Sequence, residues 1–113
     1  MKMGKFVIKR VKNGEYYFNL LSDNLQIILT SQINSSKSAC LRGIDLVKNS
    51  CSYENYERKQ TSDNKYYFVL KVSSGKVIGI SEIYSSKAGM ENVIESVKKN
   101  GNNTHVIEEE PYF

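Results

Sequence analysis

The chain repeats itself once, and the two copies lie fifty residues apart. Residues 6–51 align with residues 56–101 without a gap, and 14 of these 46 positions are identical. The segment "NSSKSACLRGIDLVKNS" of the first copy corresponds to "YSSKAGMENVIESVKKN" of the second. An internal repeat of this period indicates that each copy forms one supersecondary unit, which cannot bury its hydrophobic face alone.

The length of the chain predicts that the two copies share one core. The whole chain has 113 residues, and a core built from fifty residues would be marginal by itself. The single proline, Pro111, lies after both copies, and no linker rich in Pro, Gly or Ser separates them. We therefore expect one pseudo-symmetric domain over residues 1–113, with repeat 1 at about 4–55 and repeat 2 at about 56–109.

Each copy contains the same order of predicted elements. Segments rich in β-forming residues predict three strands per copy, and Gly14 in "KNG" can adopt the positive φ of a tight turn. A helix follows, with Ser36 or Ser86 as its N-cap, and Gly101 suits the end of the second helix. The predicted strands are "FVIKRV", "EYYFNLL" and "LQIILTSQI" in the first copy, and "NYERKQ", "YYFVLKV" and "VIGISEI" in the second.

These elements predict an α+β fold with two tandem β-β-β-α-(β) repeats. Two three-stranded units that continue edge to edge would hide their inner edges and form one antiparallel sheet. Both helices then pack on one face, related by pseudo-two-fold symmetry. A further strand is expected at residues 104–108, because this segment aligns with the end of the first copy under the same shift. Residues 53–60 would then be both the last strand of one unit and the first strand of the next.

The two copies also resemble a known protein family. An aromatic doublet followed by Phe, a hydrophobic third strand, a Ser-Lys pair and a helix ending in "VKKN" resemble the tandem unit of the YegP-like proteins, a bacterial family of unknown function. The resemblance covers almost the whole chain and implies that the final strands are exchanged to make one sheet. Leu25 departs from the pattern, since a glycine-like turn residue is usual there, as Gly75 is in repeat 2. The family supplies no catalytic residues that could be assigned to this chain.

Charge and cysteine content indicate which partners and which cellular compartment suit this chain. The formal net charge is +4 and is spread along the chain, which permits contact with nucleic acid but does not require it. Cys40 and Cys51 would be separated by roughly 16 Å along a helix, too far for a disulfide. Free thiols indicate a reducing compartment. With no signal peptide and no membrane-spanning segment in this sequence, we expect a cytoplasmic, bacterial-type protein.

No arrangement typical of an enzyme is present in the sequence. The single histidine, His105, stands beside an acidic run, and no zinc-binding or phosphate-binding motif occurs. Cys40 lies on the apolar stripe of its predicted helix, where a buried thiol is unreactive. The sequence therefore predicts no metal, no cofactor and no catalytic group.

Two features remain as candidate binding sites. "SSK" opens both predicted helices, and a helix N-terminus favours anions, so one candidate is a pair of anion sites at Ser36, Lys37, Ser86 and Lys87. The alternative is that these serines only cap the helices. The second candidate is the sheet face away from the helices, where alternation places tyrosines among lysines. Its residues are Lys9, Tyr17, Lys59, Tyr67 and Lys71.

These observations favour a small non-enzymatic binding or accessory module whose partner is a protein or a small molecule. The alternative is a weak nucleic-acid-binding protein, since tyrosines can stack on bases while lysines contact phosphates. Because a completed double unit has no obvious need for a partner copy, a monomer is expected.

Overall fold

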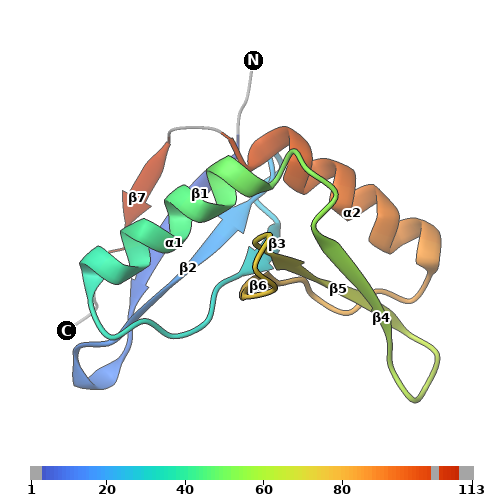
Figure 1. Ribbon diagram of the computed structural model, residues 1–113, viewed down its shortest axis with the longest axis horizontal. Helices are drawn as coiled ribbons and strands as arrows, with labels where there is room; N and C mark the ends of the chain where they lie inside the picture. Colours follow the sequence, from blue (N-terminus) through green and yellow to red (C-terminus); the bar gives the residue numbers. More distant parts are fainter. Residues whose placement is uncertain (1–3, 103–104, 110–113) are drawn as a thin grey trace.

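The described residues form one seven-stranded sheet and two α-helices (Figure 1). The structure, a computed structural model, describes residues 4–102 and 105–109. A short 3-10 helix, η1, lies between the first two strands. The elements in chain order are β1 (Lys5–Arg10), η1 (Lys12–Gly14), β2 (Tyr16–Leu21), β3 (Ile27–Thr30), α1 (Lys37–Ser50), β4 (Tyr56–Gln60), β5 (Tyr66–Lys71), β6 (Val77–Ile80), α2 (Lys87–Asn100) and β7 (Val106–Glu108).

The strands follow the order β4-β5-β6-β3-β2-β1-β7 in the sheet. The first six strands in this order pair antiparallel, but β7 pairs parallel with β1. The prediction of an entirely antiparallel sheet is therefore wrong at β7, and the sheet is mixed. Strands joined by tight turns must run antiparallel. β7 is instead connected to β6 through α2, and a connection through a helix permits a parallel neighbour.

The strand registers repeat with an offset of fifty residues. Phe6 pairs with Leu20 in repeat 1, and Tyr56 pairs with Leu70 in repeat 2. Where the repeats meet, Thr30 of β3 pairs antiparallel with Ile80 of β6. Since these two residues are equivalent in the repeat, an approximate twofold axis passes between them. β7 follows the helix of repeat 2 but pairs with the first strand of repeat 1, so this final strand crosses to the other unit.

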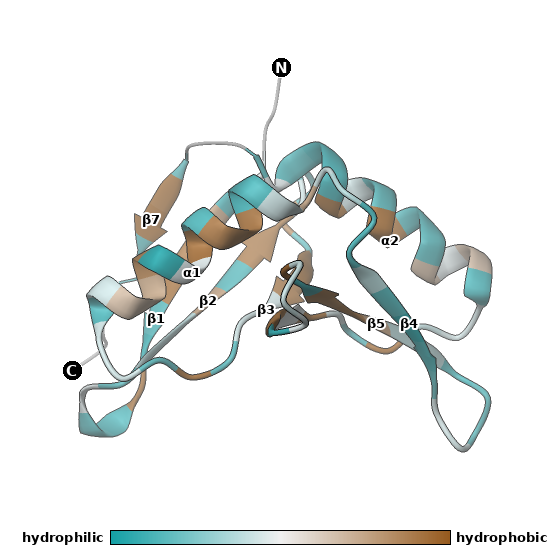
Figure 2. Cartoon of the chain, viewed as in Figure 1, coloured by the Kyte–Doolittle hydropathy of each residue, from teal (hydrophilic) through white to brown (hydrophobic). Residues whose placement is uncertain are grey.

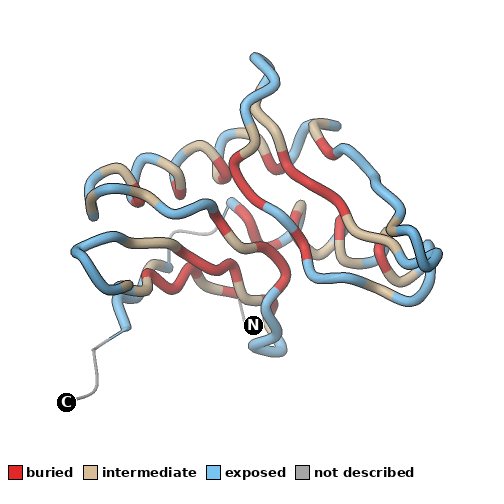
Figure 3. The backbone as a smooth tube through the Cα atoms, turned by 90° about the horizontal axis from the view of Figure 1, so that it is seen from below, coloured by how far each residue is buried: buried red, intermediate tan, exposed pale blue. Residues whose placement is uncertain are grey.

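Both helices lie on the same face of the sheet, and each one contacts strands of both repeats. α1 packs on β2 and β6, and α2 packs on β3 and β5. Figure 2 shows hydrophobic residues along the helix sides that face the strands, and Figure 3 shows burial concentrated in the central strands. The buried side chains of the two repeats form one continuous cluster, which includes Phe18, Ile44, Phe68 and Ile94.

The ends of the helices follow from local sequence. The Ser36 and Ser86 hydroxyls accept hydrogen bonds from the Ala39 and Gly89 amides, so both predicted N-caps are confirmed. The second helix ends before Gly101, as expected, but Gly101 has a right-handed φ of −71°. A Cβ at Gly101 would lie 2.8 Å from the Cys51 sulfur. The glycine is thus required by the close approach of the two helix C-termini.

Two positions near the ends of the described chain are tied together. The buried Asn100 side chain accepts a hydrogen bond from the Gly4 amide at 3.0 Å. Its amide nitrogen donates to the Ser96 carbonyl oxygen at 2.9 Å. The segment that leads into β1 is therefore anchored to the C-terminal end of α2.

The turn after β2 contains a residue in an unusual conformation. Leu25 has a φ of 65°, and its equivalent Gly75 has a φ of 94°. A left-handed conformation is readily adopted by glycine but is costly for leucine. The departure noted in the sequence thus corresponds to a locally strained turn in repeat 1.

Both cysteines are free thiols, as the sequence predicts, and both are buried. Cys40 lies within α1 and Cys51 follows its last residue. Within residues 4–102 and 105–109, no helix is long and apolar enough to cross a membrane.

Candidate functional site

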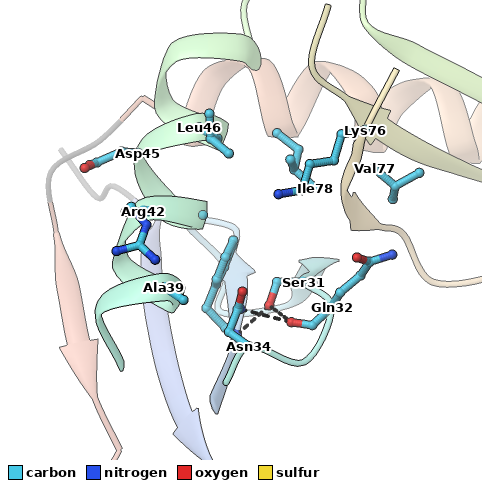
Figure 4. Close-up of a pocket in the computed structure, with 12 residues that line it drawn as sticks. Ser31, Gln32, Asn34, Ala39, Arg42, Asp45, Leu46, Lys76, Val77 and Ile78 are labelled. Carbon is cyan, nitrogen blue, oxygen red and sulfur yellow. Dashed lines mark hydrogen bonds between the residues drawn. The ribbon is translucent and has the colours of Figure 1, made fainter. Parts of the chain in front are cut away.

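A cavity of about 410 Å³ lies between α1 and the hairpin that joins β5 to β6 (Figure 4). We call it the helix-side cavity. One wall comes from repeat 1, through Phe18, Arg42 and Leu46, and the other comes from repeat 2, through Lys76 and Ile78. A volume of this size is typical of small-molecule sites.

The inner surface of the helix-side cavity is apolar. Phe18 is fully buried and Ile78 is 6% exposed. Gly43 also lines the cavity, and a Cβ at this position would lie 3.1 Å from the Phe18 ring. The missing side chain of Gly43 therefore lets α1 pack closely on the Phe18 ring, and both residues form part of the cavity wall.

Two cations stand at the rim of this cavity. Figure 4 shows the Lys76 ammonium extending from the hairpin toward α1, while the Asp45 carboxylate points away from the cavity. In the described part of the chain, neither Arg42 nor Lys76 forms an ion pair. A cation that is not neutralised by a neighbouring carboxylate can interact with an anionic ligand.

Other polar groups of the cavity are already engaged within the protein. The Ser31 hydroxyl accepts a hydrogen bond from the Phe18 amide and donates one to the Gln32 carbonyl oxygen. The Asn34 side chain donates to the same carbonyl oxygen at 3.1 Å. These bonds fix the wall of the cavity, and Arg42 and Lys76 are its lining cations.

Repeat 2 carries different residues at the equivalent positions. Tyr84 replaces Asn34 and Val93 replaces Gly43, so two larger side chains occupy the corresponding space, and both pack against the core. The two cations also have neutral equivalents, since Asn92 corresponds to Arg42 and Gln26 to Lys76. The helix-side cavity therefore combines a smaller lining from repeat 1 with one cation from each repeat.

The five residues predicted on the sheet face away from the helices form two separate groups. Lys9 and Tyr17 are cross-strand neighbours on β1 and β2, and Lys59 and Tyr67 are neighbours on β4 and β5. Four strands of the sheet, β5, β6, β3 and β2, separate β4 from β1. The structure thus brings lysine and tyrosine together in pairs at opposite ends of the sheet.

The lysines on this face are paired with carboxylates. The Lys9 ammonium lies 3.7 Å from Glu109. Glu57 lies 3.5 Å from Lys59 and 2.9 Å from Lys71. The pKa of the Glu57 carboxyl is lowered, first by the hydrogen bond from Lys71. Lys59 and Lys71 also line a shallow hollow of about 450 Å³ on this face.

The predicted helix-start sites differ in their surroundings. Both serines cap their helices, as described above. Lys37 forms an ion pair with Glu108 of β7, and the hydrogen bond that Lys37 donates to this carboxylate raises the Lys37 pKa. Lys87 forms no ion pair within the described residues. Of the two equivalent lysines, only Lys37 therefore pairs with a carboxylate of the described residues.

Sequence reasoning did not identify Arg42 and Lys76. They come from different repeats and line one cavity because α1 packs across to β6. The available signal was the repeat itself, since a comparison of the copies shows where one copy has a cation or a smaller residue than the other. Cys40 of α1 is fully buried, and burial raises the pKa of its thiol to about 11. Within residues 4–102 and 105–109, no group of three His, Cys, Asp or Glu side chains could hold a metal ion.

Several known proteins are similar to this chain. A family model for a domain of unknown function, DUF1508, matches residues 12–57 and again residues 61–108. The UPF0339 protein YegP of Yersinia pestis is 45% identical over 105 residues, which are 92% of this chain and 94% of the relative. A UPF0339 protein of Stutzerimonas stutzeri, named for its place in the ptx operon 5′ region, is 40% identical over 106 residues, which cover 93% and 96% of the two chains.

Two structures solved by NMR share the fold. The protein of unknown function yegP from E. coli superposes with a TM-score of 0.88 at 33% identity, covering 96% of this chain and 94% of that one. The UPF0339 protein SO3888 from Shewanella oneidensis gives a TM-score of 0.89 at 33% identity, covering 96% and 92%. The tandem match confirms the resemblance seen in the sequence, and the chain belongs to the YegP-like family of proteins with the DUF1508 domain.

Proposed function

We propose that this protein is a small non-enzymatic binding module, and that its helix-side cavity takes an organic anion with an apolar body. The observation that carries the proposal is the combination of Arg42 and Lys76 at the rim with Phe18 and Ile78 beneath them. Apolar burial supplies most of the affinity of such a site, and a few placed polar groups orient the ligand.

The chemistry of the cavity favours binding over catalysis. General acid–base work requires a group whose pKa lies near the operating pH. The side chains of Arg42 and Lys76 donate hydrogen bonds and carry no acceptor atom. Two such cations over an apolar surface can hold a carboxylate but supply no general base.

The test uses a matched pair of ligands and ¹⁵N-labelled full-length protein. Hexanoate should shift the amide signals of Ala39, Gly43 and Val77, whereas 1-hexanol, which lacks the carboxylate, should bind at least several-fold more weakly. Exposed ion pairs contribute roughly 0.2–1 kcal/mol each, so the double variant Arg42→Asn/Lys76→Gln should lose roughly two- to thirty-fold in hexanoate affinity.

Each substitution copies the residue that the other repeat has at the equivalent position. Gly43→Val introduces the residue found at Val93 and should remove binding by filling the cavity while the amide spectrum of β4 and β5 is retained. Equal affinities for hexanoate and 1-hexanol, or unchanged binding by the double variant, would show that the cations do not recognise the ligand. No localised shift with either ligand would refute the site.

The alternative, weak nucleic-acid binding by the open sheet face, rests on the two lysine–tyrosine pairs. The carboxylates of Glu109 and Glu57 oppose it, because they offset the charges of Lys9 and Lys71. A titration with mixed single-stranded RNA and DNA distinguishes the two functions. Salt-sensitive shifts at Tyr17 and Tyr67, rather than at the helix-side cavity, would support the alternative.

We further infer that residues 1–113 act as one pseudo-symmetric domain, with repeats at about 4–55 and 56–109. The core cluster that includes side chains of both repeats supports this inference. Two buried free thiols support a reducing, cytoplasmic setting. Unfolding monitored separately at amides of each repeat should give one coincident transition, and two separated transitions would contradict it.

A further inference from the structure

The first strands of the two repeats, β1 and β4, differ in whether another strand covers their outer edge. β1 and β4 are equivalent in the repeat, and each pairs with the next strand in the same register. β7 covers the outer side of β1, while in the described part of the chain no strand covers the outer side of β4 (Figure 1). An edge strand presents unpaired backbone donors and acceptors that can bind another extended segment.

The covered edge shows how an added strand is held. The Phe6 amide donates to the His105 carbonyl oxygen, and the Glu109 amide donates to the Ile8 carbonyl oxygen, both at 2.9 Å. Two lysines then bind consecutive carboxylates of the added strand. Lys37, at the start of α1, pairs with Glu108, and Lys9, on the open face of the sheet, pairs with Glu109.

These two ion pairs lie on opposite faces of the sheet. Because side chains alternate along a strand, Glu108 points to the helix side and Glu109 to the open side. The two lysines therefore clamp the strand from both faces. A clamp of this kind selects an extended segment with two adjacent acidic residues.

Repeat 2 retains both lysines of the clamp. Lys87 is equivalent to Lys37, and Lys59 is equivalent to Lys9. Lys87 forms no ion pair within the described residues, and Lys59 lies 3.5 Å from Glu57, whose closer partner is Lys71 at 2.9 Å. Lys87 and Lys59 can thus both pair with a new carboxylate, and Glu57 would keep Lys71 as its partner.

We propose that the outer edge of β4 binds an extended acidic peptide segment as a parallel eighth strand. Consecutive carboxylates of the segment pair with Lys87 on the helix side and with Lys59 on the open side. The occupant is a partner segment with the character of β7, an extended run ending in two acidic residues, because β7 shows this arrangement on the equivalent strand.

The residues beside this edge further define the occupant. Arg58 stands where β1 has Ile8, and it binds Glu91 and Glu54 through contacts of 2.6 Å. The helix side of the β4 edge is therefore polar. A partner segment needs fewer apolar residues than β7, whose Val106 packs against the core. The charged edge also limits unspecific pairing between copies of the protein.

The experiment uses a synthetic peptide with the sequence THVIEEE, taken from residues 104–110, and the ¹⁵N-labelled full-length protein. We expect amide shifts at residues 56–60 and at Lys87, with the signals of β1 unchanged. The control peptide THVIQQE lacks the two carboxylates that match Glu108 and Glu109, and it should bind several-fold more weakly.

Variants of the protein test the clamp directly. Lys59→Gln and Lys87→Gln should each weaken the peptide roughly two- to five-fold, as expected for an exposed ion pair. Lys12→Gln removes an exposed lysine from the turn between β1 and β2 and should leave the affinity unchanged. All three substitutions are on the surface, so the spectra of the free variants should match that of the unmodified protein.

Three results would overturn the proposal. The first is shifts confined to β1, which would mean that the peptide only displaces β7. The second is equal affinity for the two peptides, or no effect of either clamp substitution. The third is the absence of any shift. Binding at the helix-side cavity is read from different amides, so failure here leaves the proposed function untouched.

Discussion

At the scale of single residues, the two repeats show how one position tolerates two side chains. Phe6 and Tyr56 are equivalent, and each meets a phenylalanine edge-to-face, with ring centroids 5.8 and 5.5 Å apart. Lys48 lies over the Phe6 ring, and Lys98 lies over Tyr56. The additional hydroxyl of Tyr56 donates to the Cys51 carbonyl oxygen at 2.6 Å. A buried hydroxyl is thus accepted because it has a partner.

The strained turn at Leu25 leads to the first prediction. Leu25 is 61% exposed, so its replacement loses little apolar burial. Leu25→Gly relieves the left-handed strain but adds unfolded-state entropy, and it should raise the free energy of unfolding by about 1 kcal/mol. Urea denaturation measures this change. Gly75→Leu is the matched control and should lower stability by a similar amount. Destabilisation by both substitutions would contradict the explanation.

The buried thiol of Cys40 predicts a dependence of stability on pH. Burial raises its pKa from 9.0 to about 11, so the folded protein holds this proton more tightly than the unfolded chain. The contribution is complete below pH 9 and is lost as the pH rises toward 11, with a slope of at most about 1.4 kcal/mol per pH unit. Urea denaturation across this range should give a shallower decline for Cys40→Ala. Parallel declines for the two proteins would exclude the thiol as a cause.

At the scale of elements, the sequence predicts helices and hairpins well because their signals are local. Ser36 and Ser86 mark both helix starts, and the positive φ values of Asn13 and Gly14 agree with the expected turn. The third strand of each repeat is shorter than its apolar run suggests, since β3 ends at Thr30. The register between β2 and β3 also shifts near the start of β3, where Leu20 pairs with Leu29 but Leu21 pairs with Ile27. Hydrophobic alternation carries no information about such an irregularity.

Long-range pairings were less accessible to sequence reasoning. The sequence of residues 104–108 does not predict that β7 runs parallel to β1, because the direction of this strand depends on the path of the preceding helix. The candidate cavity was missed for a related reason, since Arg42 and Lys76 belong to different repeats. Strand alternation predicts which residues share the open face, but their carboxylate partners, such as Glu57, could not be assigned without the pairing of strands.

At the scale of the whole molecule, the fusion of two repeats forces them to differ near the twofold axis. Leu29 and Gly79 are equivalent positions on adjacent strands, and Leu29 is fully buried. A Cβ at Gly79 would lie 2.7 Å from the Leu29 side chain. Only one of the two sites can therefore hold a leucine, which a perfectly repeated sequence would not allow.

This asymmetry predicts that the effects of substitutions at the two sites are coupled. Gly79→Ala should lower the free energy of unfolding by about 1–3 kcal/mol, because it overpacks the core. Leu29→Ala should lower it by about 2–5 kcal/mol, because it leaves a cavity. In the Leu29→Ala background, Gly79→Ala should become neutral or stabilising, since its methyl group fills that cavity. Urea denaturation of the four proteins of this cycle measures the coupling. An equal cost of Gly79→Ala in both backgrounds would contradict the shared space.

The pairing of β7 with β1 also has a consequence for synthesis on the ribosome. Phe6 pairs with Val106, so β1 emerges a hundred residues before the strand that covers it. At roughly 5–20 residues per second, the outer edge of β1 stays open for roughly 5 to 20 seconds in every nascent chain. During that interval β1 has no partner on its outer side. The sheet is completed only when the acidic strand arrives and pairs with Lys9 and Lys37.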